Sequence, residues 1–325
     1  MTWMPAAHSD PWTRVADVRD RLWRASPPLT AVGVLMLFAA AASVVGLAVD
    51  QRTITGAPAW LKPLKFAIST AVYSLTLAWI FGWLTEWPRV RRVVGWTTAV
   101  VFVLEVAIID AQAWRGTTSH FNVGTPLDAT LFFVMGSAIF VQTAISAAVA
   151  FAVWRQRFAD RALGWAPRFG MVLTIAGAMT GPLMTRPSAA QLADARAGAH
   201  MTVVGAHSVG GVDGGRGLPV TGWSLEHGDL RVPHFIGLHA IQALALLAVG
   251  LRFWPRPDAL RVRAVLAAAA SYAGLFVLLL WQALRGQSLA APDSTALTAI
   301  AIWALTTTVL FAAIGTKDTK DAKTK

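Results

Sequence analysis

The strongest constraint on this chain is a series of apolar segments of about 20 residues each, separated by shorter charged stretches. A helix rises 1.5 Å per residue, so each segment is long enough to cross a hydrocarbon core of about 30 Å. Lipid offers no hydrogen bonds to a backbone, and this restricts such a segment to a helix. The sequence therefore predicts an all-α integral membrane protein with eight transmembrane helices. The segments are residues 29–49, 66–84, 93–114, 129–154, 165–184, 234–254, 264–284 and 295–315.

Composition supports the same class. The mean hydropathy is +0.54 and only 14% of residues are charged, against roughly 25% in a soluble domain. The net charge of +11 could indicate a nucleic-acid partner. The basic residues, however, lie in short clusters between apolar segments, which is typical of membrane orientation and not of a phosphate-binding face. We therefore expect the lipid bilayer as the partner and no nucleic acid. The lack of cysteine excludes disulfides and thiolate metal sites.

The distribution of Lys and Arg predicts the orientation. Basic residues are concentrated before the first segment, in the loops after the second, fourth and sixth segments, and in the C-terminal tail. The positive-inside rule then places both termini in the cytoplasm, and we expect the cell membrane. The predicted organisation is an amphipathic N-terminal segment (1–27) with a helix from Ser9 to Ala25, a first four-helix half (28–158), a second half (159–315) with a long outer loop (185–232), and a Lys-rich tail (316–325).

Short motifs recur in the same order at the outer ends of the helices. Four helices return the chain to its starting side, so a duplication would give parallel halves related by a pseudo-twofold axis along the membrane normal. The alternative is that Arg and Pro are common at membrane interfaces. The matched ends are Gln112-Ala-Trp-Arg115-Gly116 with Gln282-Ala-Leu-Arg285-Gly286, Lys62-Pro63 with Arg231-Val-Pro233, Pro126-Leu-Asp128 with Pro292-Asp293, and Arg52 with Arg186.

The outer loop 185–232 is too long for a simple connection. We expect a helix over Ala189–His207, followed by a glycine-rich stretch that lacks the Gly-Lys-Ser/Thr of a P-loop. A Gly-rich outer loop leading into a helix with His234 and His239 resembles haem A synthase over residues 210–239. Histidines matching that family are absent from the second, fourth and eighth segments, and Lys65 takes the place corresponding to His234. No residue role is carried over from this resemblance.

Six of the seven histidines lie on the outer side, which predicts a site there. Neutral imidazole suits iron, copper or zinc, so His207, His234 and His239 are candidate ligands of a transition metal or haem. Arg115 and Arg285 are candidates to clamp the acidic groups of a cofactor or anionic substrate. The alternatives are interfacial histidines and arginines that reach the lipid headgroups.

Three further residues are candidates for catalysis: Glu105, Asp110 and His120. A charge in the middle of a helix costs about 2.5–3.5 kcal/mol on insertion scales, so Glu105 faces the bundle, a cavity or a partner, or is protonated. The function predicted first is a redox protein that binds a transition metal or haem at the site on the outer side. Two further functions are alternatives. One is a transporter in which Glu105 couples a proton or cation to a small-molecule cargo. The other is an enzyme that acts on an outer-leaflet lipid.

Overall fold

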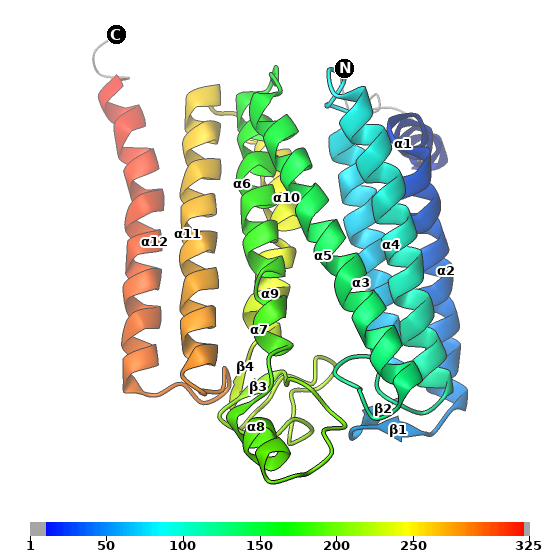
Figure 1. Cartoon of the computed structure of the whole chain (residues 1–325). Coiled ribbons are helices and arrows are strands. Elements are labelled where there is room, and N and C mark those ends of the chain that lie inside the picture. Colours follow the sequence, from blue (N-terminus) through cyan, green and yellow to red (C-terminus); the bar gives the residue numbers. More distant parts are fainter. Residues whose placement is uncertain (1–10, 322–325) are drawn as a thin grey trace. The chain divides into compact units, whose positions relative to one another are not determined.

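The computed structural model describes the backbone of residues 11–321 and the side chains of residues 15–314. Helices dominate this part of the chain (Figure 1). The expected start of the N-terminal helix, Ser9, lies outside the described residues. The helices are α1 (Pro11–Ala25), α2 (Pro27–Val49), α3 (Leu61–Phe81), α4 (Pro88–Trp114), α5 (Pro126–Arg155), α6 (Arg161–Ala178), α7 (Gly181–Met184), α8 (Ala189–Arg196), α9 (Arg231–Leu238), α10 (Ala240–Leu251), α11 (Asp258–Leu284) and α12 (Ser294–Asp321). The short strands are β1 (Thr53–Ile54), β2 (Ala57–Pro58), β3 (Ser208–Val209) and β4 (Gly228–Asp229).

The chain forms two compact units. The first comprises Met1–Ile54, Pro58–Thr117 and Met135–Gln156. Within it, α2, α3 and α4 each pack against the other two, and α1 packs against α2 and α3. The apolar cluster at their centre includes Val32, Met36 and Phe102. The expected N-terminal helix is thus present as α1, and the first three apolar segments form one helical bundle.

The second unit comprises Thr55–Ala57, Thr118–Val134 and Arg157–Lys325. Helix α6 packs against α9, α10 and α11, and α12 packs against α11. The loop between α7 and α9 carries α8 and the antiparallel pair β3–β4, in which Ser208 lies opposite Asp229. This unit therefore combines a helical bundle with a folded loop between α7 and α9.

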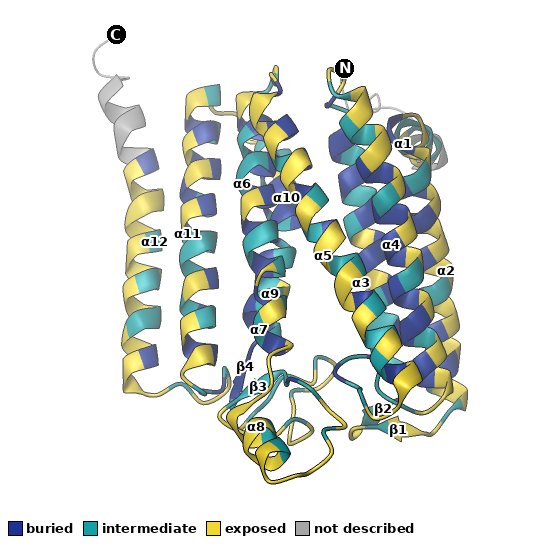
Figure 2. Ribbon diagram, in the orientation of Figure 1, coloured by how far each residue is buried: buried dark blue, intermediate teal, exposed yellow. Residues whose placement is uncertain are grey.

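Among the described residues, six helices are long and apolar enough to cross a membrane: α2, α3, α4, α5, α11 and the first part of α12. The pair α9–α10 qualifies as a seventh only if both helices, which are bent by 41°, count as one span. Helix α6 is not among them because Arg161 and Arg168 lower its hydropathy. Large apolar side chains are exposed along these helices, for example Phe133 and Phe140 at 74% each (Figure 2).

Three expected helices have different bounds. The sixth segment is interrupted at His239, so His239 lies at a break and not inside a continuous helix. The fifth segment also stops early, because α6 ends at Ala178 and α7 forms a separate turn. The expected helix Ala189–His207 is wrong in extent: only Ala189–Arg196 is helical, closed at its start by a capping box of Ser188 and Gln191.

The C-terminal ends of α4 and α11 have the same local structure. Gly116 and Gly286 both adopt φ +74°, a conformation that glycine reaches without strain. The N–H of Gly116 donates to Ala113 O (3.0 Å) and that of Thr117 to Gln112 O (3.0 Å). The N–H of Gly286 donates to Ala283 O (2.9 Å) and that of Gln287 to Gln282 O (3.3 Å). Both ends are Schellman motifs that occupy otherwise free carbonyl groups.

Candidate functional site

Two interrupted helices of the second unit touch through their backbones. A Cβ atom on Gly237 of α9 would lie 2.4 Å from the Cα atom of Gly177 in α6. Such a distance leaves no room for any side chain, so glycine is required on both helices. Both helices end within three residues of this contact, α6 after Ala178 and α9 after Leu238. We call this crossing, with Gly177, Thr180, His234, Gly237 and Tyr272, the helix-break site.

Side chains from neighbouring helices satisfy the carbonyl groups at the break between α9 and α10. In a continuous helix the carbonyls of Ile236 and Leu238 would accept from residues 240 and 242. Instead, the hydroxyl of Tyr272 donates to Ile236 O at 2.6 Å, and the hydroxyl of Thr174 donates to Leu238 O at 3.3 Å. Insertion of polar groups into the hydrogen-bond ladder is a recognised cause of a helix bend. The interruption is therefore made by tertiary contacts and needs no proline at the bend.

The break at the end of α6 is closed by a second set of polar contacts. The carbonyl of Gly177 accepts from the Thr180 hydroxyl at 2.7 Å and from His234 Nδ1 at 2.8 Å. Because a carbonyl can only accept, His234 carries its proton on Nδ1, and its Nε2 atom holds the lone pair. His234 thus links α9 to α6 at the point where both helices are interrupted.

The loop between α7 and α9 is ordered around Asp213. Its carboxylate accepts from the backbone N–H of His207 (2.8 Å) and of Ser208 (2.7 Å), and from His207 Nδ1 (2.9 Å). These hydrogen bonds outweigh partial burial and hold the pKa of Asp213 well below its ordinary value. The His207 ring also packs edge-on against Phe121, with ring centroids 4.8 Å apart. Asp213 is therefore the residue that orients His207.

The predicted metal ligands are not gathered as a chelating group. Among the described residues, no set of three or more His, Asp or Glu side chains is arranged to hold a metal ion. His207 is held by Asp213, His234 by Gly177 and Thr180, and His239 packs on the Phe235 ring with centroids 4.3 Å apart. Each histidine therefore has its own local environment, although all three belong to the second unit.

Both predicted arginine clamps lie next to the Schellman motifs. Arg285 pairs with Asp293 at 2.7 Å and stacks on Trp281 at 4.6 Å from the ring centroid. Arg115 donates to the side chain of Gln112, one turn back on α4. In this structure both guanidinium groups are thus engaged in contacts close to their own helix ends.

The three candidate catalytic residues fall in different units. Glu105 and Asp110 lie on α4 of the first unit, where Glu105 is 2% exposed and Lys62 is near enough to act on it electrostatically. His120 lies in the second unit, and its Nδ1 is 3.1 Å from the hydroxyl of Ser119. Ser119 itself is 3% exposed.

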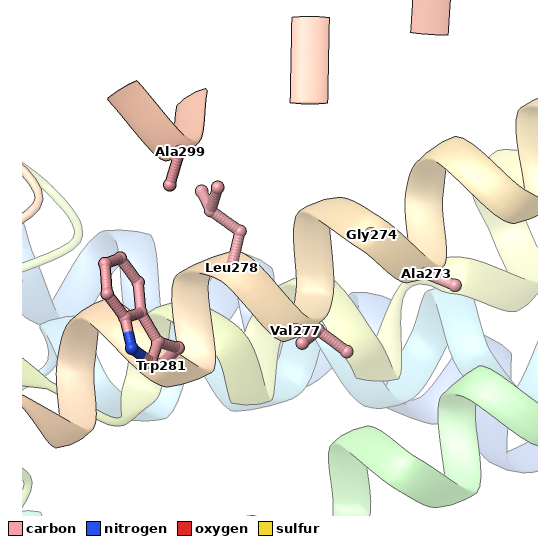
Figure 3. A pocket seen from close by; sticks show the side chains of 6 residues that line it. All are labelled: Ala273, Gly274, Val277, Leu278, Trp281 and Ala299. Atoms are coloured by element: carbon pink, nitrogen blue, oxygen red, sulfur yellow. The ribbon is translucent and has the colours of Figure 1, made fainter. Parts of the chain in front are cut away.

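A separate apolar groove lies between α11 and α12 (Figure 3). It has a volume of about 470 Å³ and is lined by Ala273, Gly274, Val277, Leu278, Trp281 and Ala299. These side chains offer hydrocarbon and the indole ring of Trp281, with no acid or base. The groove lies on helices that qualify as membrane spans, so it matches a surface solvated by lipid tails.

Sequence reasoning missed Thr174, Thr180, Tyr272 and Gln242, which lie at the helix-break site or beside it. Hydroxyl and amide groups inside apolar helices are common, and nothing in their spacing distinguishes these four. The signal that could have found the region is the pair Gly177 and Gly237, because glycine within a helix lowers its stability unless close packing requires it.

The fold and the site define a mostly helical, multi-pass membrane protein with interrupted helices. Its apolar surface and six or seven candidate spans carry that assignment. No protein-family model matches the chain, and neither a curated protein nor a solved structure matches it. The function is therefore argued from the site alone.

Proposed function

We propose that the protein is a membrane transporter whose solute-binding site is the helix-break site of the second unit. The supporting observation is that two helices are interrupted where they cross, at Gly177 and Gly237. Irregular backbone at membrane depth is tolerated only where it is buried in protein or lines a polar cavity. Interrupted helices near the bilayer midplane form the solute sites of many transporters. His239 lies eight residues after the start of α9, about 12 Å into the span.

The proposal includes eight spans with both termini in the cytoplasm. Helix α6 and α7 together extend from Arg161 to Met184, long enough to cross the bilayer with a break. Arg168 lies over the ring of Trp165 at 4.9 Å from its centroid, an arrangement suited to the cytoplasmic interface. The pair α9–α10 then supplies the sixth span.

We also propose that the two halves are a duplication. Two features support it. The first is the shared Schellman motif after α4 and α11, with Gln, Ala, Arg and Gly at matching positions. The second is that α2, α3 and α4 pack against one another, as α6, the α9–α10 pair and α11 do in the second unit. Pro63 and Pro233 are both the third residue of their helices, and both are buried.

In this transporter Glu105 is the proposed coupling residue. It lies in the first unit, is buried within α4, and has Lys62 in electrostatic range. A carboxyl inside a membrane helix is usually retained for function, since its charged form is costly there. Replacing Glu105 with Gln should abolish ion-driven uptake and leave insertion unchanged. Glu86→Gln, an exposed loop variant, is the control.

Water access to the helix-break site tests the proposal. The chain has no cysteine, so single-cysteine variants can be read without background. His239→Cys and Ile236→Cys should react with a hydrophilic, membrane-impermeant methanethiosulfonate reagent. Leu246→Cys, on the outward face of α10 and 72% exposed, should not react, because hydrocarbon surrounds it. Correctly inserted protein in which neither His239→Cys nor Ile236→Cys reacts from either side would show that the break is a dry structural bend.

A second candidate function is a redox protein that binds haem or a transition metal. One observation favours it: an acceptor holds the Nδ1 atom of both His207 and His234, which is how proteins orient metal-ligating histidines. Haem would need only one or two of these histidines. Visible absorption and metal analysis of the purified protein test it: a Soret band or stoichiometric metal that is lost in His234→Ala would support this function over transport.

A further inference from the structure

Three buried hydroxyl groups of the first unit have no hydrogen-bond partner within the described part of the chain: those of Ser26, Ser74 and Thr98. These residues are 3%, 0% and 0% exposed, respectively. A hydroxyl inside a helix often donates to the carbonyl four residues earlier, as those of Ser43 and Thr70 do in the same unit. A buried hydroxyl without a partner is destabilising, so these three positions favour a species that can form hydrogen bonds with them.

Ser26 lies at the end of the bundle that the proposed topology places in the cytoplasm. It is the N-cap residue of α2, where a serine usually accepts from a backbone N–H, but it makes no such bond. The first two residues of the helix, Pro27 and Pro28, have no N–H to donate. The Ser26 hydroxyl faces α4, where a Cβ atom on Gly95 would lie only 2.9 Å from it. Because Pro27 is exposed, this buried hydroxyl is one residue away from the protein surface.

Thr98 and Glu105 continue from Gly95 along one face of α4. Thr98 lies three residues after Gly95, about 4.5 Å along the helix axis, and Glu105 lies about 10.5 Å beyond Thr98. Residues separated by three and by seven positions lie on the same face of a helix. Both Thr98 and Glu105 are buried. The face of α4 that begins beside Ser26 therefore leads to the Glu105 carboxyl group.

Ser74 of α3 supplies a polar group between Thr98 and Glu105. The ring of its neighbour Tyr73 packs edge-on against that of Phe102, with centroids 5.4 Å apart. Phe102 lies between Thr98 and Glu105 on α4, so Ser74 lies at an intermediate level along the bundle. Successive polar groups are thus separated by about 5 Å along the axis, a gap that a bridging water molecule can span.

We propose that the first unit carries protons between the cytoplasmic end of α2 and Glu105 along a hydroxyl path, formed by Ser26, Thr98 and Ser74 with bridging water molecules. This inference rests on the proposed transport function and names the proton as the ion that Glu105 couples to the solute. At each step an oxygen atom accepts a proton from the oxygen before it and releases its own proton to the next, so no group is consumed. The last step converts the Glu105 carboxylate to a neutral carboxyl group, and the reverse order returns the proton.

The spacing of the path favours a proton over a metal cation. Oxygen ligands of a cation such as calcium lie about 2.3–2.6 Å from it, so two ligands of one ion are at most about 5 Å apart. Thr98 and Glu105 are separated by about 10.5 Å along α4 and cannot share an ion. A proton needs no shell of ligands, because it passes between single oxygen atoms.

Infrared spectroscopy of the full-length protein in lipid tests the path without a known solute. The C=O stretching band of the protonated Glu105 carboxyl group is assigned at acidic pH by its loss in Glu105→Gln. After a change from ordinary to deuterated water, the rate at which this band shifts measures how fast the carboxyl group exchanges its proton. Thr98→Val and Ser74→Ala should each slow this exchange about tenfold or more, since each removes a hydrogen-bonding group from the path.

Ser43→Ala is the matched control, because Ser43 is 1% exposed in the same unit but its hydroxyl donates to Ala39 O of its own helix at 2.9 Å. It should exchange at the rate of the unaltered protein. Thr98→Ser retains the hydroxyl and should also exchange at that rate, and if Thr98→Val does not fold, Ser74→Ala decides. Equal exchange rates in all variants, equal slowing by Ser43→Ala, or no Glu105 band down to about pH 4 overturn the inference.

The path and the transport function can fail separately. If exchange is equally fast in all variants but Glu105→Gln still abolishes ion-driven uptake, the transport function stands and only the path is rejected. If the path variants slow exchange while neither His239→Cys nor Ile236→Cys reacts with the hydrophilic thiol reagent, the path is supported and the transport site is rejected.

Discussion

Gly177 and Gly237 set how closely α6 and α9 approach, and they are the residues through which the crossing can be tested. Gly237→Ala would place a methyl group against the backbone of α6, and overpacking of this kind costs about 1–3 kcal/mol. We expect a lower unfolding temperature, measured by circular dichroism in detergent. Gly250→Ala is the control: apart from the adjacent backbone of its own helix, nothing lies within 4 Å of its Cβ position, so it should be neutral or stabilising. Equal effects of both substitutions would contradict the close contact.

The contacts of Asp293 predict that the stability of the first turn of α12 depends on pH. Its carboxylate pairs with Arg285 and accepts from the backbone N–H of Ala296 in the first turn of α12, which together lower its pKa to about 2. The unfolded chain would protonate this group near its ordinary value of 3.8. Because the pKa is lower in the folded state, the stabilisation is complete above about pH 4 and is lost between about pH 4 and pH 2.

Hydrogen exchange of the first turn of α12 measures this effect. The ratio of exchange rates between Asp293→Asn and the unaltered protein should be largest at pH 5 and approach one near pH 2. Asp258→Asn, in the first turn of α11, is the control, and it should leave exchange in α12 unchanged. A ratio that stays constant from pH 5 to pH 2 would be inconsistent with the pairing of Asp293.

At the scale of an element, the interruption of α9–α10 depends on hydroxyl groups supplied by other helices. Tyr272→Phe removes the donor to Ile236 O and leaves a buried carbonyl unsatisfied, at a cost of about 1–3 kcal/mol. The chain has only one other tyrosine, Tyr73, whose hydroxyl makes a longer 3.5 Å contact with Ser146. Tyr73→Phe should therefore destabilise the protein less, as measured by thermal unfolding. The reverse order would argue against side-chain support of the break.

At the scale of the whole molecule, the eight-span topology makes the clearest prediction. Reporter fusions after residues 90, 160, 258 and 320 should read cytoplasmic, and fusions near residues 56, 122, 215 and 289 should read external. The physical reason is that clusters of arginine and lysine resist transfer across the membrane. Fusions at 122 and 160 lie on either side of α5, and those at 160 and 215 on either side of α6 and α7. An external reading at 160 or 258 would exclude the proposed arrangement.

The sequence by itself determined the class of the protein and most of its helices. Six predicted segments match continuous helices to within six residues at each end, because a run of about 20 apolar residues in lipid has few alternatives to a helix. The sequence also indicates the ends of α4 and α11. A glycine directly after an apolar helix, as in Arg-Gly, is typical of a helix end that needs a left-handed backbone conformation. These features depend on the local spacing of residues and on the transfer of apolar segments into lipid, and the order of residues along the chain determines both.

Only the tertiary structure decided where the helices are interrupted and which groups hold each histidine. The segment around His239 looks continuous in sequence, because the donors that open it, Tyr272 and Thr174, come from other helices. The role of Asp213 in holding His207 likewise depends on the folding of a glycine-rich loop with no periodic pattern. The periodicity of apolar residues indicates only the average surroundings of each face of a single helix. A break, a partner or a binding site depends on a few atoms of residues distant in sequence, and so it is fixed only when the helices pack.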